Sequence, residues 1–174
     1  AIVVDETGQE VPPGTIGRLA VSGPTGCRYL DDLENQRKYV QRGWNITGDA
    51  YRVDEQGYFW YQSRTDDMIV SSGYNISGVE VEHVLFEHPD VIDAAIVGVP
   101  HRELGEEVKA VVQLRAGASP DVEEIRAFCR QHLADFKVPE YVEFVDAPLP
   151  RNPAGKVLKR LLRDEFWEGR SIRV

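Results

Sequence analysis

The hydrophobic pattern of the chain changes between Arg64 and Asp67, and this change does most to restrict the fold. Before it, short apolar runs are separated by turns rich in Gly and Pro, which is typical of β-strands. After it, strand-like runs alternate with stretches whose apolar residues recur at helical spacing. This order predicts an α+β fold with two units. Residues 1–65 should be rich in β-strands, and residues 66–174 should form a compact domain whose small sheet is covered by helices.

The same patterns predict the individual elements. Strands are expected at residues 2–4, 18–22, 50–53, 58–63, 68–70, 91–99, 107–114 and 141–145. Helices are expected at residues 33–40, 78–88, 120–133 and 157–167. The third helix should bury Val122, Ile125, Cys129 and Leu133, and the last should turn Leu158, Leu161 and Leu162 inward.

The composition excludes some classes of function. The net charge of −9 leaves no basic field for nucleic acid or for an anionic membrane, and no stretch is apolar enough to span a bilayer. Two cysteines and four histidines follow no metal-binding spacing. We therefore expect no metal site, reduced thiols and a cytoplasmic location. The chain begins as if inside a strand, so we expect it to be a piece of a longer protein.

Lys156 stands out as a candidate functional residue. It lies in residues 150–156, a loop interrupted by prolines that precedes the last predicted helix. A lysine there is expected to be a mobile cation beside free backbone N–H groups, which suits a phosphate or a developing oxyanion. The alternative is an ordinary surface lysine ahead of a basic helix.

Three motifs, taken in their order along the chain, resemble those of a known family. They are residues 47–49 (Thr-Gly-Asp), residues 61–76 with the following Glu80-Val-Glu82, and residues 150–156. Together they closely resemble the C-terminal third of the adenylate-forming superfamily, which includes acyl-CoA synthetases, peptide-synthetase adenylation domains and luciferases. The amino-acid sequence at residues 23–29, 43–51 and 58–64 is most similar to the benzoate- or aminobenzoate-CoA ligases and the medium-chain acyl-CoA ligases.

The resemblance implies an architecture and a reaction. Residues 1–65 would end the β-barrel-like part of a larger N-terminal domain, and residues 66–174 would be a mobile lid domain. The enzyme would activate an aryl or medium-chain carboxylic acid with ATP to acyl-AMP, and CoA would then displace AMP. Mg²⁺ would be bound mainly by the N-terminal part that this sequence lacks, so the isolated chain should be inactive. The implied partners are the acid, ATP and CoA, and a homodimer is left open.

Two other readings stay open at this point. One is an adenylation domain that loads a carrier protein instead of CoA. The other is a non-catalytic docking or regulatory module that has kept the fold and lost the activity.

The resemblance also assigns roles to residues on the nucleotide side. Asp49 would accept hydrogen bonds from the ribose of ATP, although a turn-capping role is the alternative. Arg64 would bind ribose oxygens or the α-phosphate, unless it forms a surface ion pair with Asp66 or Asp67. Tyr61 would lie near the nucleotide or in the core. Asp66 would be the hinge between the units.

The resemblance also assigns residues to CoA, the acceptor of the acyl group. Ser72, Gly73 and Tyr74 match the loop that lines the pantetheine tunnel. A side chain at Gly73 would block a thin ligand, whereas the alternative is a simple turn glycine. Lys156 would stabilise the charge that builds up during adenylation. Three residues depart from relatives at positions that contact the nucleotide or CoA, so those contacts are not carried over: Asn75, Leu104 and Glu140.

Overall fold

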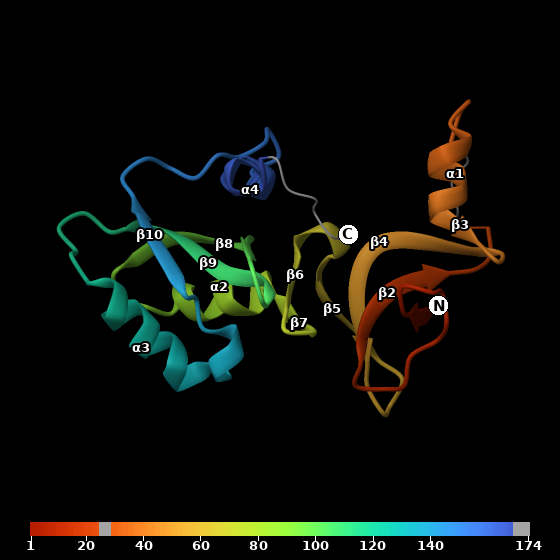
Figure 1. The fold of residues 1–174 in the computed structure, drawn as a ribbon, viewed down its shortest axis with the longest axis horizontal. Coiled ribbons are helices and arrows are strands. Elements are labelled where there is room, and N and C mark those ends of the chain that lie inside the picture. Colours follow the sequence, from red (N-terminus) through yellow and green to blue (C-terminus); the bar gives the residue numbers. More distant parts are fainter. Residues whose placement is uncertain (25–28, 169–174) are drawn as a thin grey trace. The chain divides into compact units, whose positions relative to one another are not determined.

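The computed structural model describes residues 1–24 and 29–168. The chain forms two compact units, Ala1–Asp66 and Asp67–Val174 (Figure 1). Each unit has its own sheet and its own hydrophobic cluster, so each is described separately. Cys27 and part of the motif at residues 23–29 lie outside the described residues.

The first unit is an antiparallel sheet with one short helix. Its elements are β1 (Ile2–Val4), β2 (Ile16–Val21), α1 (Leu33–Tyr39), β3 (Val40–Gln41), β4 (Trp44–Val53) and β5 (Phe59–Arg64). The strand order is β1-β2-β4-β3, and β5 also pairs with β4. Val4, Ala20 and Ile46 form the buried cluster of this sheet. The central strand β4 pairs with three other strands, β2, β3 and β5.

The sequence predicted β4 too short. Its middle contains Gly48 and Asp49, which resemble loop residues in sequence, yet the strand continues through them. Gly48 has a φ of +76°, and it lies between Ile46 and Ala50, where the pairing of β4 with β2 is irregular. A glycine at a bulge lets the strand bend without ending.

The second unit has a five-stranded mixed sheet. Its strands are β6 (Met68–Ser71), β7 (Tyr74–Ser77), β8 (Val91–His101), β9 (Gly105–Leu114) and β10 (Tyr141–Val145). The order is β10-β9-β6-β7, with β8 also pairing with β9. β8 and β9 form a long antiparallel hairpin, whereas β10 runs parallel to β9.

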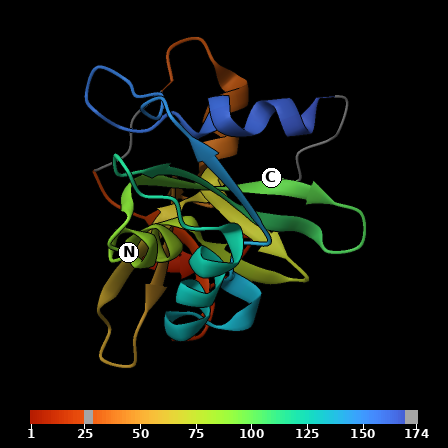
Figure 2. The same cartoon turned by 90° about the vertical axis from the view of Figure 1, so that its left-hand side faces the viewer.

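Helices cover both faces of this second sheet. α2 (Gly78–Phe86) and α3 (Val122–His132) lie on one face, and α4 (Lys159–Trp167) lies on the other (Figures 1 and 2). Two 3₁₀ turns, η1 (Thr65–Asp67) and η2 (Asp135–Lys137), complete the fold. The antiparallel first sheet and the mixed second sheet with its covering helices confirm the predicted α+β class.

The alternation of β9 explains why both faces need helices. Val108, Ala110 and Val112 pack in the main core with residues of α2 and α3. Between them, Val111 points to the opposite face and packs with Ala95 and Leu149. Successive side chains of a strand point to opposite faces, so the buried run of β9 from Val108 to Val112 needs cover on both.

Several predicted details were wrong at the ends of elements. α3 begins after Asp121, which forms a capping box with Glu124, and Val122 is consequently exposed. Leu158 and Leu161 are exposed, and of the three leucines only Leu162 packs in the small cluster beneath α4. Strand β7 was not predicted, because its four residues contain polar Asn75 and follow a turn directly. Among the described residues, no helix is long and apolar enough to cross a bilayer.

Candidate functional site

Asp49 and Arg64 face each other across neighbouring strands of the first unit. They are Cα partners in the β4–β5 pairing, and Arg64 Nη1 lies 3.2 Å from Asp49 Oδ1. Arg64 Nε also lies 3.5 Å from Asp66 Oδ1. Burial lowers the pKa of the Arg64 guanidinium, but the negative charges of Asp49 and Asp66 outweigh it and raise that pKa overall. The sheet thus brings three predicted residues into one charged cluster.

Gly48 lies beside this cluster. A Cβ at Gly48 would lie 3.4 Å from Arg64 Nη2, close to an ordinary contact, whereas its φ of +76° is unfavourable for other residues. The backbone conformation therefore accounts for glycine at this position. The surface ion pair between Arg64 and Asp66, the alternative role of Arg64, does form, and it coexists with the Asp49 pair.

Tyr61 and Asp66 occupy exposed positions near this cluster. Tyr61 lies on β5, is half exposed, and packs edge-on against Tyr51 with 5.5 Å between ring centroids. Asp66 lies in η1 and is the last residue of the first unit. A position between two compact units is where a hinge is expected, and the hinge role itself stays a prediction.

Ser72 and Gly73 form the two-residue turn of the β6–β7 hairpin. Their φ values are +50° and +81°, as the two central positions of a type I′ turn require. Ser72 N–H donates to the carbonyl oxygen of Leu104 at 2.9 Å, which ties this turn to the β8–β9 turn. A Cβ at Gly73 would meet nothing within 4 Å. The positive φ is therefore a sufficient reason for glycine here, and a role beside pantetheine stays a prediction.

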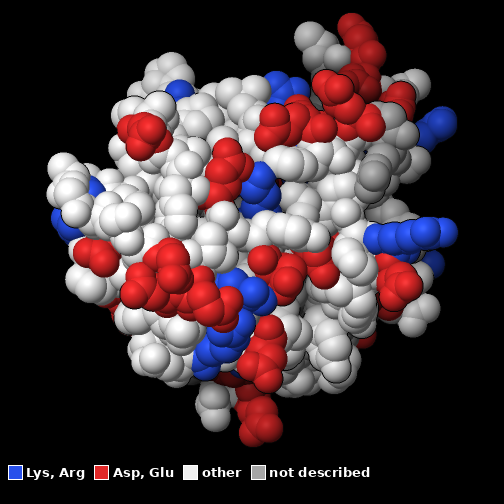
Figure 3. All heavy atoms as spheres, turned by 60° about the vertical axis from the view of Figure 1, so that its left-hand side comes forward, with Lys and Arg blue, Asp and Glu red and all other residues white. Residues whose placement is uncertain are grey.

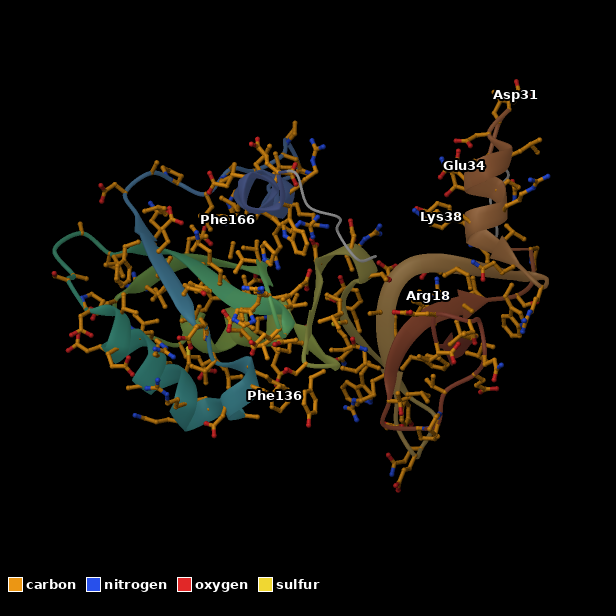
Figure 4. The ribbon with its side chains drawn as sticks, in the orientation of Figure 1. Arg18, Asp31, Glu34, Lys38, Phe136 and Phe166 are labelled. Atoms are coloured by element: carbon orange, nitrogen blue, oxygen red, sulfur yellow. The ribbon has the colours of Figure 1, made fainter. Side chains whose placement is uncertain are left out.

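Tyr74 follows this turn and stacks on Phe136. The two ring centroids are 4.7 Å apart, and the planes are inclined by 25°. Phe136 belongs to η2, and it lies at the edge of the second unit (Figure 4). Both rings remain partly exposed, so the hairpin presents an aromatic surface.

The loop that carries Lys156 is a closed hairpin. Asn152 N–H donates to the Lys156 carbonyl at 2.9 Å, and Lys156 N–H donates to Asn152 Oδ1 at 2.9 Å. Ala154 N–H shares that side-chain oxygen, and Gly155 N–H donates to the Asn152 carbonyl. The prediction of free backbone N–H groups beside Lys156 is therefore wrong. The Asn152 side chain and the turn have already used them.

The side chain of Lys156 remains available. It is exposed, and no carboxylate in the described part of the chain lies within ion-pair distance of its ammonium group. By contrast, the neighbouring Lys159 is paired with Glu82 at 2.6 Å. The loop therefore offers a fixed backbone and a cation that no acidic group neutralises.

Two ion pairs that the sequence did not reveal hold this loop. Arg151 Nη1 donates to the Gly155 carbonyl at 2.6 Å, and its other terminal nitrogen pairs with Asp93 on β8. At the start of α4, Lys159 pairs with Glu82 of α2, and both side chains are almost buried at 13% and 12% exposure. These partners are far apart in sequence, so no local spacing could indicate them.

The predicted site residues fall into two groups. Asp49, Tyr61, Arg64 and Asp66 belong to the first unit, whereas Ser72, Gly73, Tyr74 and Lys156 belong to the second. In residues 1–24 and 29–168 no group of three or more His, Cys, Asp or Glu side chains could hold a metal ion. On the face shown in Figure 3, basic side chains lie among acidic ones rather than in a continuous basic surface.

Comparison with known proteins identifies the family. Residues 80–156 match the AMP-binding enzyme C-terminal domain. A fatty acid–[acyl-carrier-protein] ligase, ScoC of Streptomyces coeruleorubidus, is 40% identical over 95% of this chain and 32% of its own length. Acetyl-coenzyme A synthetase of Bacillus subtilis is 39% identical over 97% of this chain and 30% of its own length.

Solved structures agree with the sequence comparison. ATP-bound MatB from Rhodopseudomonas palustris aligns with a TM-score of 0.83 and 37% identity, covering 98% of this chain and 34% of MatB. The anthranilate CoA ligase AuaEII in complex with anthranoyl-AMP aligns with a TM-score of 0.81 and 34% identity, covering 95% and 33% of the two chains.

The fold and these matches identify the chain as a C-terminal part of the AMP-binding enzyme family. Residues 80–156 carry the match to the C-terminal domain, and the relatives include acyl-CoA and acid–CoA ligases and a carrier-protein ligase. The chain spans about a third of the length of the curated relatives that it matches.

Proposed function

We propose that this chain is the C-terminal part of an ATP-dependent acid–CoA ligase that activates an aryl or medium-chain carboxylic acid. The observation that carries the proposal is Lys156, an unpaired cation on a rigid hairpin in the C-terminal domain of this family. The likeness to an anthranilate CoA ligase supports an aryl acid.

The proposed reaction has two steps. A substrate carboxylate oxygen attacks the α-phosphorus of ATP, the bond to the β-phosphate oxygen breaks, and pyrophosphate leaves. The sulfur of CoA then attacks the acyl carbonyl, AMP leaves with the bonding electrons, and the thiol proton is released to solvent. The first step brings a carboxylate and a phosphate together, so a fixed cation between them lowers the barrier.

Six of the eight predicted site residues have a part in the two chemical steps. Lys156 would supply the cation for the first step, and Asp49 with Arg64 would hold the ribose of ATP. The turn at Ser72 and Gly73 with Tyr74 would line the pantetheine passage in the second step. The described residues offer no acidic cluster for Mg²⁺, so no role in binding the ion is assigned to them.

A second candidate is a ligase that loads a carrier protein. The 40% identity to ScoC, a fatty acid–[acyl-carrier-protein] ligase, favours this candidate. By the family resemblance, position 140 is one where medium-chain relatives often have an arginine that contacts CoA, whereas this chain has Glu140 there, paired with Arg126 at 2.6 Å. That contact with CoA is therefore not assigned to this chain.

The test is ATP–pyrophosphate exchange by the full-length protein that contains this chain, across aryl and medium-chain acids. We expect exchange that depends on the acid, and formation of AMP and thioester when CoA is added. Acyl transfer to a carrier protein but not to CoA would instead establish the second candidate. Absence of exchange with every acid would leave only the non-catalytic module. The 174-residue chain alone should show no turnover.

The sequence-based expectations of a cytoplasmic location and of a homodimer stay predictions. Size-exclusion chromatography with light scattering on the full-length protein measures its oligomeric state directly.

A further inference from the structure

The geometry points to Arg151 as a positioning residue for Lys156, acting together with Asp93. This inference rests on the proposed function, because it concerns how the cation for adenylation is placed. Arg151 itself is expected to touch neither ATP nor the acid.

Arg151 connects the Lys156 loop to the central sheet. One terminal nitrogen donates to the carbonyl of Gly155, the residue directly before Lys156, at 2.6 Å. The other terminal nitrogen pairs with Asp93 Oδ2 on β8. The backbone of Arg151 also forms a β-bridge with Val157, the residue directly after Lys156. Both neighbours of Lys156 in the chain are thus held by the same residue.

Asp93 is well placed to receive this guanidinium. Its side chain is only 16% exposed, and its other oxygen, Oδ1, accepts a hydrogen bond from Ala94 N–H at 3.0 Å. The carboxylate is therefore fixed to the backbone of β8, next to the bulge in the pairing between Val91 and Asp93. An anchor of this kind defines the position of the loop relative to the sheet.

The shape of arginine matters for this role. Its planar guanidinium presents donors in two directions at once, so it can bridge a carboxylate and a carbonyl. A lysine has one ammonium on a flexible stem and would hold one of the two partners less rigidly.

The position of Lys156 depends on this bridge, because its own side chain has no partner in the described chain. The backbone hydrogen bonds to Asn152, the hydrogen bond from Leu158 N–H to the Pro150 carbonyl at 2.7 Å and the bridge through Arg151 fix the backbone from which the Lys156 side chain extends. Reacting groups displaced by about 1 Å can lose up to about 10²-fold in rate.

The experiment measures the two half-reactions separately in the full-length protein. Acyl-adenylate formation is followed with the acid and ATP, and thioester formation is followed from supplied acyl-adenylate and CoA. For Arg151→Gln we expect adenylation to fall by about 10-fold to 10²-fold. Thioester formation should stay within about twofold, since the lysine is proposed to act only in the first step. Arg151→Lys should recover part of the loss.

Asp93→Asn provides a second variant that is expected to fold, since the amide can keep the bond to Ala94 N–H. It should slow adenylation in the same way. In the double variant Arg151→Gln/Asp93→Asn, acyl-adenylate formation should be no slower than in the slower of the two single variants, because the two residues act as one unit.

Arg130→Gln is the matched control. Arg130 is exposed to 41%, close to the 42% of Arg151, and it pairs with Glu123 within α3. Both half-reactions should be unchanged in this variant. Wild-type adenylation rates for both Arg151→Gln and Asp93→Asn, or an equal fall of both half-reactions, would overturn the positioning role and leave the proposed function intact. Failure of the wild-type protein to form any acyl-adenylate would overturn both.

Discussion

Lys156 differs from Lys137 and Lys159 of the same unit in what surrounds its charge. Lys159 is neutralised by Glu82, and Lys137 is held by both oxygens of Glu80. Lys156 has a fixed backbone and an ammonium group without an acidic neighbour in the described chain. A cation kept unpaired in this way suits a ligand charge that arrives from outside the domain.

Replacement of Lys156 tests its role directly. Lys156→Ala in the full-length protein should slow acyl-adenylate formation by roughly 10²-fold or more, because one stabilising charge is lost from the transition state. Thioester formation from supplied acyl-adenylate should largely survive. An equal loss in both half-reactions would contradict the assignment of Lys156 to the first step.

Cys129 is a residue whose environment predicts low reactivity. It is fully buried in the core between α3 and the sheet, and burial raises the pKa of its thiol to about 11. The reactive thiolate is therefore scarce below pH 9. In a Cys27→Ser variant, Cys129 should resist iodoacetamide at pH 8 and react rapidly in urea.

The sign of the pH effect on stability follows from the same shift. The thiol keeps its proton longer in the folded state than in the unfolded state, where the pKa is near 9.0. Its contribution to stability is thus complete below pH 9 and is lost as pH rises toward 11. A Cys129→Ala variant should show less loss of stability over this range, and an equal loss would contradict the burial argument.

At the scale of elements, Gly73 in the β6–β7 hairpin could be required for either of two reasons: its positive φ, or the space left by its missing side chain. Gly73 needs a positive φ, yet it has free space around its Cα. Gly73→Ala should lower the free energy of unfolding by about 1 kcal/mol, because an L-residue is strained at this φ. Gly73→Asn should be closer to wild type, since asparagine tolerates this conformation. Urea denaturation of the 174-residue chain measures both.

The Gly73→Asn variant also tests the proposed pantetheine passage. In the full-length protein, Gly73→Asn keeps the turn but adds a side chain, so we expect slower thioester formation with unchanged adenylation. Wild-type thioester formation in this variant would mean that the glycine serves the turn alone.

The contact between α2 and α4 predicts an unequal effect of two nearby glutamates. Glu82 pairs with nearly buried Lys159 and accepts from Ile96 N–H at 2.8 Å. Glu82→Ala should lower the free energy of unfolding by about 3 kcal/mol, because it leaves a buried charge unpaired. Glu80→Ala removes the more exposed pair with Lys137 on the same helix and should change stability by less than about 1 kcal/mol. Similar losses in both variants, measured by urea denaturation, would show that burial does not distinguish the pairs.

At the scale of the whole molecule, Asp66 lies where one compact unit ends and the next begins. Proline at this position fixes φ and disfavours the helical conformation of Thr65 in η1. Asp66→Pro should therefore depress at least one half-reaction of the full-length protein. Asp66→Ala removes the carboxylate near Arg64 without restricting the backbone, and it serves as the control. Wild-type rates of both half-reactions in Asp66→Pro would exclude a hinge at this residue.

The sequence predicted the elements better than their connections. The bounds of β10 and the start of β6 were predicted correctly, because short apolar runs between turn residues are local signals. The pairing of Asp49 with Arg64 could not be predicted, because it depends on the register between two strands. The bridge from Arg151 to Asp93 depends on how a loop packs against a distant strand.

The Lys156 loop illustrates the same limit. Prolines and a glycine correctly indicated a turn, but its N–H groups are satisfied by Asn152, a residue inside the same loop. Asparagine side chains compete for backbone groups in turns, and the sequence alone did not show which ones would be used.

The parallel pairing of β10 with β9 has a consequence for the order of folding. The β8–β9 hairpin closes through a short turn, whereas β10 pairs with β9 only after residues 115–140, which contain α3. Contacts between residues close in sequence form early, whereas contacts between distant residues form later because closing the long loop costs conformational entropy. Substitutions in the β8–β9 hairpin should therefore slow refolding, whereas substitutions in β10 should mainly speed unfolding. The segment that carries Lys156 would then be among the last to dock, when the sheet that holds its anchor is already complete.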